Sequence, residues 1–419
     1  MQKLIIKGRK ELSGRISISG SKNATLPILA ASILAKRVRI KNVPLVKDIF
    51  TMIELLDFIG LKIKLIKKKN IIEIFNNEEN INTLAPYKLV KTMRAGVLVL
   101  GSLLTKYRKA KVSLPGGCAI GTRPVDLHLY ALKKLGAKIK IKDGYIFAEA
   151  KNGLKGARIR FPSISVGATE NALLAAFRAK GRTILKNCAI EPEVIDLVNF
   201  LKKLGAKINV KGRTISISEH KTKIEKIIHQ VIFDRIELGT YIVAGTLLTK
   251  KSLVIDKIDP KIIKSEIAVL KKIGVKIVKN KNSIVIKKSK RLKKIDITTK
   301  PYPGFPTDMQ AQLMVLLTQV RGISKIKENI FENRFMHVPE LRRMGANIQI
   351  KDKTAIINGP TKLTGAEVMA TDLRASVSLV LAGLIAENRT IINRIYHLDR
   401  GYENLEKKLK ACKAEIKRI

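Results

Sequence analysis

Tryptophan is absent from this 419-residue chain, and cysteine, histidine and aromatic residues are scarce. The three cysteines, Cys118, Cys188 and Cys412, lie far apart and form no CxxC pair. An odd number of widely spaced cysteines argues against a disulfide framework and against a structural zinc site. The five histidines show no metal-ligand spacing either. We therefore expect neither a metal nor a cofactor.

Acidic residues are also few: 34 aspartates and glutamates face 82 lysines and arginines, which gives a net charge of +48. Such an excess is typical of nucleic-acid-binding proteins, because phosphate backbones attract basic side chains. Here, however, the basic residues are spread along the whole chain, and no basic block is interleaved with aromatic residues that would stack on bases. We interpret the charge as solvated lysines, with no specific nucleic-acid partner, although weak nonspecific binding would follow from it.

Long apolar runs are missing as well. The longest, residues 95–104 and 375–386, fall short of the roughly 18 to 20 residues that a membrane span requires. The first residues become charged within a few positions and lack the apolar core of a secretory signal. We expect a cytoplasmic protein without membrane contact, and the length suggests two domains.

One motif is repeated six times. Its copies are residues 53–65, 129–141, 198–210, 267–279, 338–350 and 402–419. The first five copies each hold a glycine, at intervals of 76, 69, 69 and 71 residues, and the sixth has Lys413 in its place. Regularly spaced apolar residues predict an amphipathic helix, the glycine its left-handed end, and the alternating residues that follow a half-buried strand.

A second type of helix, apolar nearly all round, lies between these copies. Its instances are residues 24–35, 95–105, 168–177, 238–249, 311–320 and 375–386. A helix without a polar face has to be surrounded by protein, so each repeat is predicted to hold an interior helix, an outer helix and several strands. The result is an α/β protein of two domains with three repeats each.

Charged residues gather where the interior helices begin. They include the cations Lys22, Arg94 and Arg374 and the acids Asp234, Asp308 and Asp372. Helix capping accounts for the acids. A cation at a helix N-terminus is unfavourable unless an anion joins it, so these starts predict a site for an anionic ligand.

Nine segments resemble those of the UDP-N-acetylglucosamine 1-carboxyvinyltransferase family, and the match runs from end to end. They are residues 20–35 (GSKNATLPILAASILA), 91–95 (KTMRA), 113–128 (SLPGGCAIGTRPVDLH), 164–176 (ISVGATENALLAA), 190–196 (IEPEVID), 305–312 (FPTDMQAQ), 331–341 (FENRFMHVPEL), 370–376 (ATDLRAS) and 395–403 (IYHLDRGYE). The resemblance implies two inside-out α/β barrel domains, each of three βαβαββ units, with the active site in the cleft between them. It assigns residues 22–232, including the Cys118 loop, to one domain and residues 1–21 plus 233–419 to the other.

The resemblance also implies a reaction: transfer of the enolpyruvyl group of phosphoenolpyruvate to the 3-hydroxyl of UDP-N-acetylglucosamine, with release of phosphate. This is the first committed step of peptidoglycan precursor synthesis. Both substrates are anionic small molecules, and arginine binds carboxylate and phosphate through paired hydrogen bonds. The implied phosphoenolpyruvate-binding residues are Lys22, Asn23, Arg123, Arg334, Arg374 and Arg400. We expect no other partner and a monomer.

Cys118 corresponds to the family's proton donor, which also becomes attached to phosphoenolpyruvate and to epoxide antibiotics of the fosfomycin type. A thiol suits this role, because its ordinary pKa of about 8.5 makes both of its forms accessible near neutrality. Gly116 and Gly117 predict a mobile loop that closes over the substrates. By the same resemblance Asp308 takes or positions the proton of the sugar hydroxyl, and the other catalytic residues are Lys22, Asp372 and Arg400.

A larger set of residues is implied for UDP-N-acetylglucosamine. The set is Asn23, Arg94, Arg123, Pro124, Val125, Asp126, Leu127, Ser163, Ser165, Val166, Gly167, Asp308 and Ile330. Two members depart from some relatives, which have lysine in place of Ser163 and valine in place of Ile330. Cys188 and Cys412 are predicted to be buried and inert.

Three alternative functions stay open. A shikimate-pathway enolpyruvyl transferase shares the fold but lacks the PGGC loop and the RPVDLH segment, which are both present here. A basic nucleic-acid-binding repeat protein would gather its charge on one face and would not need Cys118. An inactive paralogue would have lost reactive residues, whereas all those expected are in place.

Overall fold

The computed structural model describes residues 2–77, 81–116, 125–219 and 225–419. These residues form two compact units: residues 2–19 with 233–419, and residues 20–116 with 125–232. Each unit has its own hydrophobic core. Three predicted site residues, Cys118, Arg123 and Pro124, lie outside the described residues.

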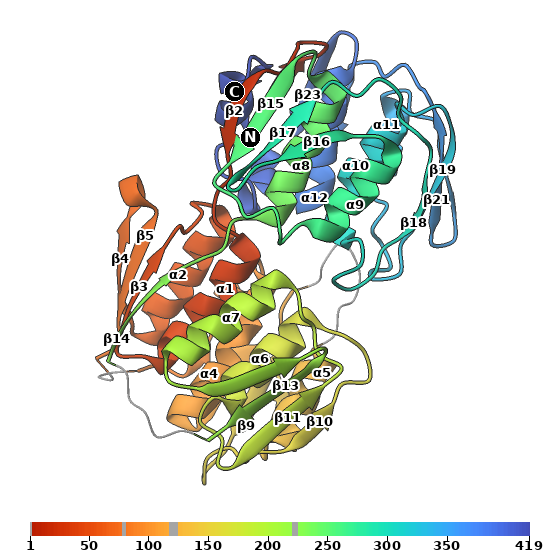
Figure 1. Ribbon diagram of the computed structural model, residues 1–419. Coiled ribbons are helices and arrows are strands. Elements are labelled where there is room, and N and C mark those ends of the chain that lie inside the picture. Colours follow the sequence, from red (N-terminus) through yellow and green to blue (C-terminus); the bar gives the residue numbers. More distant parts are fainter. Residues whose placement is uncertain (1, 78–80, 117–124, 220–224) are drawn as a thin grey trace. The chain divides into compact units, whose positions relative to one another are not determined.

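Six helices fill the interior of the two units, as their lack of a polar face predicts. They are α1 (Lys22–Ala31), α4 (Val99–Tyr107) and α6 (Val166–Ala176) in the unit of residues 20–232, and α8 (Arg235–Leu248), α10 (Gln310–Leu317) and α12 (Leu373–Ile385) in the other. Helices α8, α10 and α12 pack against one another, and α4 packs against both α1 and α6 (Figure 1). The predicted interior helices are confirmed.

The repeated motif forms the outer helices. They are α2 (Lys47–Ile59), α5 (Asp126–Lys134), α7 (Pro192–Lys203), α9 (Lys264–Ile273), α11 (Val338–Arg343) and α13 (Leu405–Ala411). The glycine after α2, Gly60, is left-handed with φ 111°, and Lys413 after α13 is left-handed with φ 73°. The sixth repeat therefore keeps the turn of the other five, with a side chain that disfavours it.

Six four-stranded sheets cover the helices, and all follow one pattern: a parallel pair of strands extended by two antiparallel strands. In the unit of residues 20–232 the sheets, in strand order, are β14 (Lys226–Gln230), β3 (Arg37–Lys41), β5 (Ile71–Phe75) and β4 (Lys62–Ile66); β6 (Leu84–Ala85), β7 (Lys109–Ser113), β9 (Tyr145–Glu149) and β8 (Lys138–Lys142); and β10 (Arg158–Arg160), β11 (Arg182–Lys186), β13 (Thr214–Ser218) and β12 (Lys207–Lys211). In the other unit they are β16 (Lys276–Lys279), β17 (Ser283–Lys287), β15 (Ser252–Asp256) and β2 (Gly14–Ser17); β18 (Asp296–Thr298), β19 (Gly322–Lys327), β21 (Thr354–Gly359) and β20 (Ile348–Lys351); and β22 (Glu367–Met369), β23 (Arg389–Asn393), β1 (Leu4–Lys7) and β24 (Glu415–Arg418). Helices inside and sheets outside, three times in each unit, are the predicted α/β architecture.

Short helices connect these elements. They are α3 (Tyr87–Val90) and the 3-10 helices η1 (Ser32–Leu34), η2 (Lys67–Lys69), η3 (Arg94–Leu98), η4 (Thr307–Met309) and η5 (Ile395–Arg400). Among the described residues no helix combines the length and the apolar character needed to cross a bilayer.

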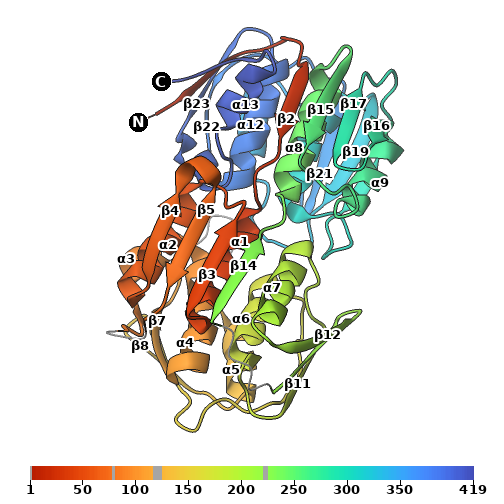
Figure 2. The ribbon, with the colours of Figure 1, turned by 60° about the vertical axis from the view of Figure 1, so that its left-hand side comes forward.

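The two ends of the chain meet in one sheet. Strand β1 runs antiparallel to both β23 and β24, with Leu4 opposite Ile392 and Arg418. Beyond this strand the backbones of Lys3 and Ile419 exchange hydrogen bonds of 2.8 and 3.0 Å. Figure 2 shows the N- and C-terminal ends emerging together. Strand β1, near the N-terminal end, thus completes the sheet that β23 and β24 form near the C-terminal end.

Candidate active site

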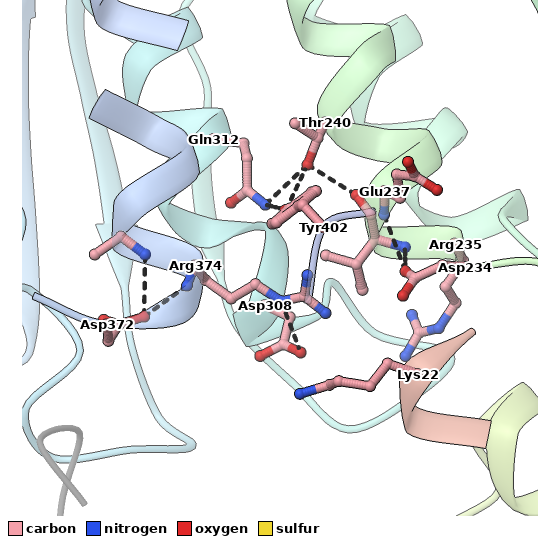
Figure 3. Close-up of polar contacts among 12 residues, drawn as sticks. Lys22, Asp234, Arg235, Glu237, Thr240, Asp308, Gln312, Asp372, Arg374 and Tyr402 are labelled. Atoms are coloured by element: carbon pink, nitrogen blue, oxygen red, sulfur yellow. Dashed lines mark hydrogen bonds and ion pairs between the residues drawn. The ribbon is translucent and has the colours of Figure 1, made fainter. Parts of the chain in front are cut away.

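Asp308, in η4 at the start of α10, lies between two arginines. Arg334 donates from Nη2 to Asp308 Oδ1 at 2.8 Å, and Arg374 donates from Nε to Asp308 Oδ2 at 3.4 Å. Figure 3 shows Arg374 and Asp308 meeting at the start of α12. Both guanidinium groups are buried, with Arg334 5% and Arg374 2% exposed. Three segments distant in sequence thus bring three predicted site residues together.

Asp372 fixes the backbone that carries Arg374. Its carboxylate accepts hydrogen bonds from the N–H groups of Arg374, at 2.7 Å, and Ala375, at 3.0 Å, and so caps α12. Asp234 caps α8 in the same way, through Ile236 and Glu237. The structure therefore gives Asp372 a capping contact that places Arg374 at the first turn of its helix.

The Arg374 guanidinium is buried, and some of its hydrogen-bond donors are not used within the described part of the protein. Its Nη1 and Nη2 make no hydrogen bond of ordinary geometry to the described residues. Burial opposes its charge, but the surrounding groups, including the carboxylates of Asp308 and Asp234, outweigh burial and raise the pKa of Arg374 above its usual range. A buried cation with unused donors in a planar fork is suited to a carboxylate or a phosphate.

His337, which lies in the same motif as Arg334, is 1% exposed. Burial, with a contribution from Arg334 and against the effect of Asp372, lowers the pKa of His337 to about 4. The ring is therefore neutral near pH 7, and it adds no charge to the surroundings of Asp308. Sequence reasoning did not select His337, although it belongs to the motif of residues 331–341.

Two further predicted residues of this unit lie on connecting segments. Ile330 donates its N–H to Glu328 Oε1 at 2.7 Å, in the segment that follows β19. Arg400 is the last residue of η5, two positions before Tyr402. Arg400 lies in the motif of residues 395–403, and Ile330 directly precedes the motif of residues 331–341.

In the other unit, Lys22 opens α1 and forms a buried ion pair. Its Nζ lies 3.0 Å from Oδ2 of Asp48, in the first turn of α2, and the side chains are 9% and 6% exposed. Ser21 caps α1 by accepting from the N–H of Ala24. The predicted Asn23 follows in the first turn of α1. Asp48 was not predicted, because an acid in the first turn of a helix is ordinary.

The segments predicted to hold the nucleotide sugar meet at the starts of α5 and α6. Val125 precedes α5, whose first turn holds Asp126 and Leu127. Ser165 caps α6 by accepting from the N–H of Ala168 at 3.3 Å, with Val166 and Gly167 following. Two adjacent helix N-termini offer N–H groups and positive potential to a diphosphate.

The approach of these two segments is close. A Cβ atom at Gly167 would lie 3.1 Å from Cε1 of His128, closer than most such contacts, so any larger residue would have to displace the His128 ring. Nδ1 of the His128 ring lies 3.1 Å from Nδ2 of Asn171, in α6. Of the remaining predicted contacts, Arg94 begins η3 and Ser163 is exposed in the loop before α6.

The two cysteines that the structure describes are buried. Burial raises the pKa of Cys188 to about 12 and also raises the pKa of Cys412. Neither thiol is therefore a good nucleophile near neutral pH. No group of three or more histidine, cysteine, aspartate or glutamate side chains within the described ranges is arranged to hold a metal ion.

Comparison with known proteins assigns this fold and these motifs to the enolpyruvyl transferases. The family model of EPSP synthase (3-phosphoshikimate 1-carboxyvinyltransferase) matches residues 6–409. The enolpyruvyl transferase NikO from Streptomyces tendae superimposes with a TM-score of 0.92 at 26% identity, covering 100% of this chain and 98% of that one. EPSP synthase from Acinetobacter baumannii shares the fold, with a TM-score of 0.76 at 18% identity, over 100% of this chain and 99% of that one.

Curated relatives narrow the assignment within this class. The UDP-N-acetylglucosamine 1-carboxyvinyltransferase of Pelagibacter ubique (strain HTCC1062) is 58% identical over 100% of both chains. The enzyme of the same name from Rickettsia akari (strain Hartford) is 52% identical, again over 100% of both chains. The chain belongs to the UDP-N-acetylglucosamine 1-carboxyvinyltransferase family. The shikimate-pathway alternative is not favoured.

Proposed function

We propose that the protein transfers the enolpyruvyl group of phosphoenolpyruvate to the 3-hydroxyl of UDP-N-acetylglucosamine and releases phosphate. The observation that carries this proposal is the full-length identity of 58% to a relative of that name. The Asp308, Arg334 and Arg374 cluster supports it, because it combines a carboxylate with two buried cations. We further propose that the reaction takes place in the cytoplasm, on a monomer, and begins peptidoglycan precursor synthesis.

The reaction is an addition followed by an elimination. The sugar oxygen attacks C2 of phosphoenolpyruvate and loses its proton to a base, while an acid delivers a proton to C3. In the second step C3 gives up a proton, the C2–O bond to phosphate breaks, and the double bond returns. One acid near C3, one base near the sugar hydroxyl and cations around phosphate and carboxylate are therefore needed.

We assign these tasks to residues of both units. Cys118 is the proposed acid at C3 and Asp308 the base, with Asp372 acting through the backbone of Arg374. The proposed phosphoenolpyruvate contacts are Lys22, Asn23, Arg123, Arg334, Arg374 and Arg400. The proposed UDP-N-acetylglucosamine contacts are Asn23, Arg94, Arg123, Pro124, Val125, Asp126, Leu127, Ser163, Ser165, Val166, Gly167, Asp308 and Ile330. The proposal requires two domains, residues 22–232 and residues 1–21 plus 233–419, to act on the same pair of substrates.

The test is phosphate release by the purified protein. We expect release from phosphoenolpyruvate only when UDP-N-acetylglucosamine is also present, with one phosphate formed for each sugar nucleotide consumed. The control replaces the nucleotide sugar with shikimate 3-phosphate. Release with that control alone, or no release with either acceptor, would contradict the proposal.

A further inference from the structure

Three buried polar side chains form a group that includes Tyr402, whose ring lies beside the Arg374 guanidinium, and none of the three is among the predicted site residues. The group consists of Thr240 from α8, Gln312 from α10 and Tyr402, which follows η5 (Figure 3). They are 1%, 0% and 3% exposed, within the unit whose three interior helices meet there. Buried polar groups need hydrogen-bond partners, and these three side chains provide partners for one another, although Gln312 Oε1 has none among the described residues.

The direction of each hydrogen bond follows from the donors available. Thr240 donates its single hydroxyl hydrogen to the carbonyl of Ile236 at 2.9 Å. The 2.9 Å contact between Thr240 Oγ1 and Tyr402 Oη must then be donated by Tyr402. Gln312 Nε2 donates to both oxygens, at 3.2 and 3.3 Å. In the reverse orientation the amide oxygen would compete with Thr240 for the one hydrogen of Tyr402, so the orientation with Nε2 toward the two hydroxyls forms more hydrogen bonds.

This pattern turns the phenol hydrogen of Tyr402 toward Thr240 and leaves the ring and the oxygen lone pairs to its other neighbours. The Cζ atom of Arg374 lies 5.3 Å from the centroid of the Tyr402 ring. Burial raises the pKa of Tyr402 although Arg374 acts against it, so the phenol stays neutral. A neutral ring attracts the guanidinium without cancelling its charge.

We infer that Thr240, Gln312 and Tyr402 are positioning residues that hold the Arg374 guanidinium against the Tyr402 ring, so that Nη1 and Nη2 receive the anionic group of the substrate. The inference rests on the proposed function, because it takes phosphoenolpyruvate as the anion. An arginine side chain has many rotamers, and ordering it before binding removes that entropic cost from the binding step. Tyr402 makes the contact with Arg374, and Thr240 and Gln312, which come from two other segments, hold the Tyr402 phenol in place.

Tyr402→Phe tests the inference, because it removes the phenol oxygen and keeps the ring. We expect kcat/KM for phosphoenolpyruvate to fall about tenfold, as for the loss of a buried hydrogen bond near a charged group. KM for UDP-N-acetylglucosamine should stay within about twofold of the wild-type value. The matched control is Tyr241→Phe, on the same α8 and 0% exposed, whose hydroxyl takes no part in the group. It should keep wild-type kinetics.

A double-mutant cycle separates positioning from a general structural role. In an Arg374→Lys background the planar fork is gone, so Tyr402→Phe should lower kcat/KM for phosphoenolpyruvate by less than about twofold further. If the decreases in kcat/KM caused by the two substitutions simply multiply in the double variant, the inference is overturned, because Tyr402 then acts independently of Arg374.

Thr240 provides a second test that holds even if Tyr402→Phe fails to fold. Thr240→Ser keeps the acceptor for the phenol hydrogen and should keep kcat/KM for phosphoenolpyruvate, whereas Thr240→Val should lower it about as much as Tyr402→Phe. A wild-type protein that releases no phosphate would contradict the proposed function. An active wild type with unchanged kinetics in Tyr402→Phe and Thr240→Val would overturn this inference alone.

Discussion

The Asp308 carboxylate is engaged on both oxygens before any substrate is present, since Arg334 and Arg374 each donate to one of them. An incoming carboxylate or phosphate can bind the unused Nη1 and Nη2 of Arg374 directly, but it competes with Asp308 for Nη2 of Arg334. Each hydrogen bond that moves from Asp308 to the substrate frees one of its lone pairs. Binding of the anion would in this way prepare Asp308 to accept the proton of the sugar hydroxyl.

Asp308→Asn should separate the two roles of this residue. We expect kcat to fall by about 10² to 10⁴, because the amide cannot take a proton. KM for phosphoenolpyruvate should not rise, since the arginines lose a competitor. Steady-state phosphate release measures both constants, and Asp352→Asn, in the exposed turn between β20 and β21, is the control. A variant that changes KM alone would contradict the assignment of Asp308 as the base.

His337 should make the free energy of unfolding depend on pH. Its pKa is about 4 in the folded protein, against about 6.5 in an unfolded chain, so the unfolded state binds more protons in between. Its contribution to stability is present above pH 6.5 and is lost as the pH falls toward 4, by about 2 to 3 kcal/mol. Denaturant unfolding of the wild type and His337→Gln at pH 7 and pH 4 measures the difference. Equal losses in both proteins would refute the prediction.

The charged site residues could be selected from sequence because they stand in recognisable motifs, as Asp308, Arg334 and Arg374 do. Tyr402 stands in one of those motifs too, yet its contact with Thr240 spans 162 residues. No local pattern shows which buried hydroxyl a distant phenol will meet. The pairing of Lys22 with Asp48 could not be predicted either, because an acid in the first turn of a helix is ordinary and the pair depends on the packing of α1 against α2.

At the scale of elements, the interior helices could be predicted in kind, but all of them except α4 begin earlier in the structure than the apolar pattern predicted. The apolar pattern predicted a start at residue 238, whereas α8 begins at Arg235, after its cap at Asp234. Charged residues do not look like part of a buried helix. Arg235 is nevertheless buried, because its Nη1 pairs with Glu266 Oε1 at 2.6 Å. An ion pair between α8 and α9 thus allows a charged residue to belong to the buried part of a helix.

The left-handed residue after α13 tests whether the sixth repeat is less stable because it lacks the glycine of the other five. Lys413 occupies the left-handed position with φ 73°, where a Cβ atom costs about 1 to 2 kcal/mol. Lys413→Gly should therefore stabilise the protein by about 0.5 to 1 kcal/mol, after the greater freedom of glycine in the unfolded chain is subtracted. Urea unfolding monitored by circular dichroism gives the change.

A second glycine variant in α13 controls for the general effect of introducing glycine. Lys410→Gly lies on the exposed side of the same helix and should destabilise the protein by about 1 kcal/mol. If both glycine variants destabilise equally, the left-handed position has no special cost and the prediction fails.

At the scale of the whole molecule, the fold brings basic and aromatic residues together where no continuous segment does. A groove of about 440 Å³ on the sheet of β6, β7, β9 and β8 is lined by Lys109, Lys111, Lys138, Lys140 and Phe147, among others. The Nζ atom of Lys111 lies 4.9 Å from the centroid of the Tyr145 ring and 5.0 Å from the centroid of the Phe147 ring. Strand pairing creates this surface, so sequence reading could not detect it.

The charge of +48 should make the protein bind polyanions without sequence preference. In fluorescence anisotropy, a single-stranded oligonucleotide should bind with an affinity that falls steeply with salt, by a log–log slope of about −0.7 for each phosphate contact. Oligonucleotides of different sequence and equal length should behave alike. A strong sequence preference that survives high salt would contradict this expectation and would revive a dedicated nucleic-acid function.

The pairing of β1 with β23 and β24 has a consequence for synthesis on the ribosome. Strand β1 is made before its partner β23, which begins 382 residues after the end of β1. At roughly 5 to 20 residues per second β1 waits roughly 20 to 80 seconds for β23, while the unit of residues 20–232 already has all its strands and can fold. The adjoining ends also make the chain suited to circular permutation, because a short covalent link from Lys3 to Ile419 would follow a connection that hydrogen bonds already make.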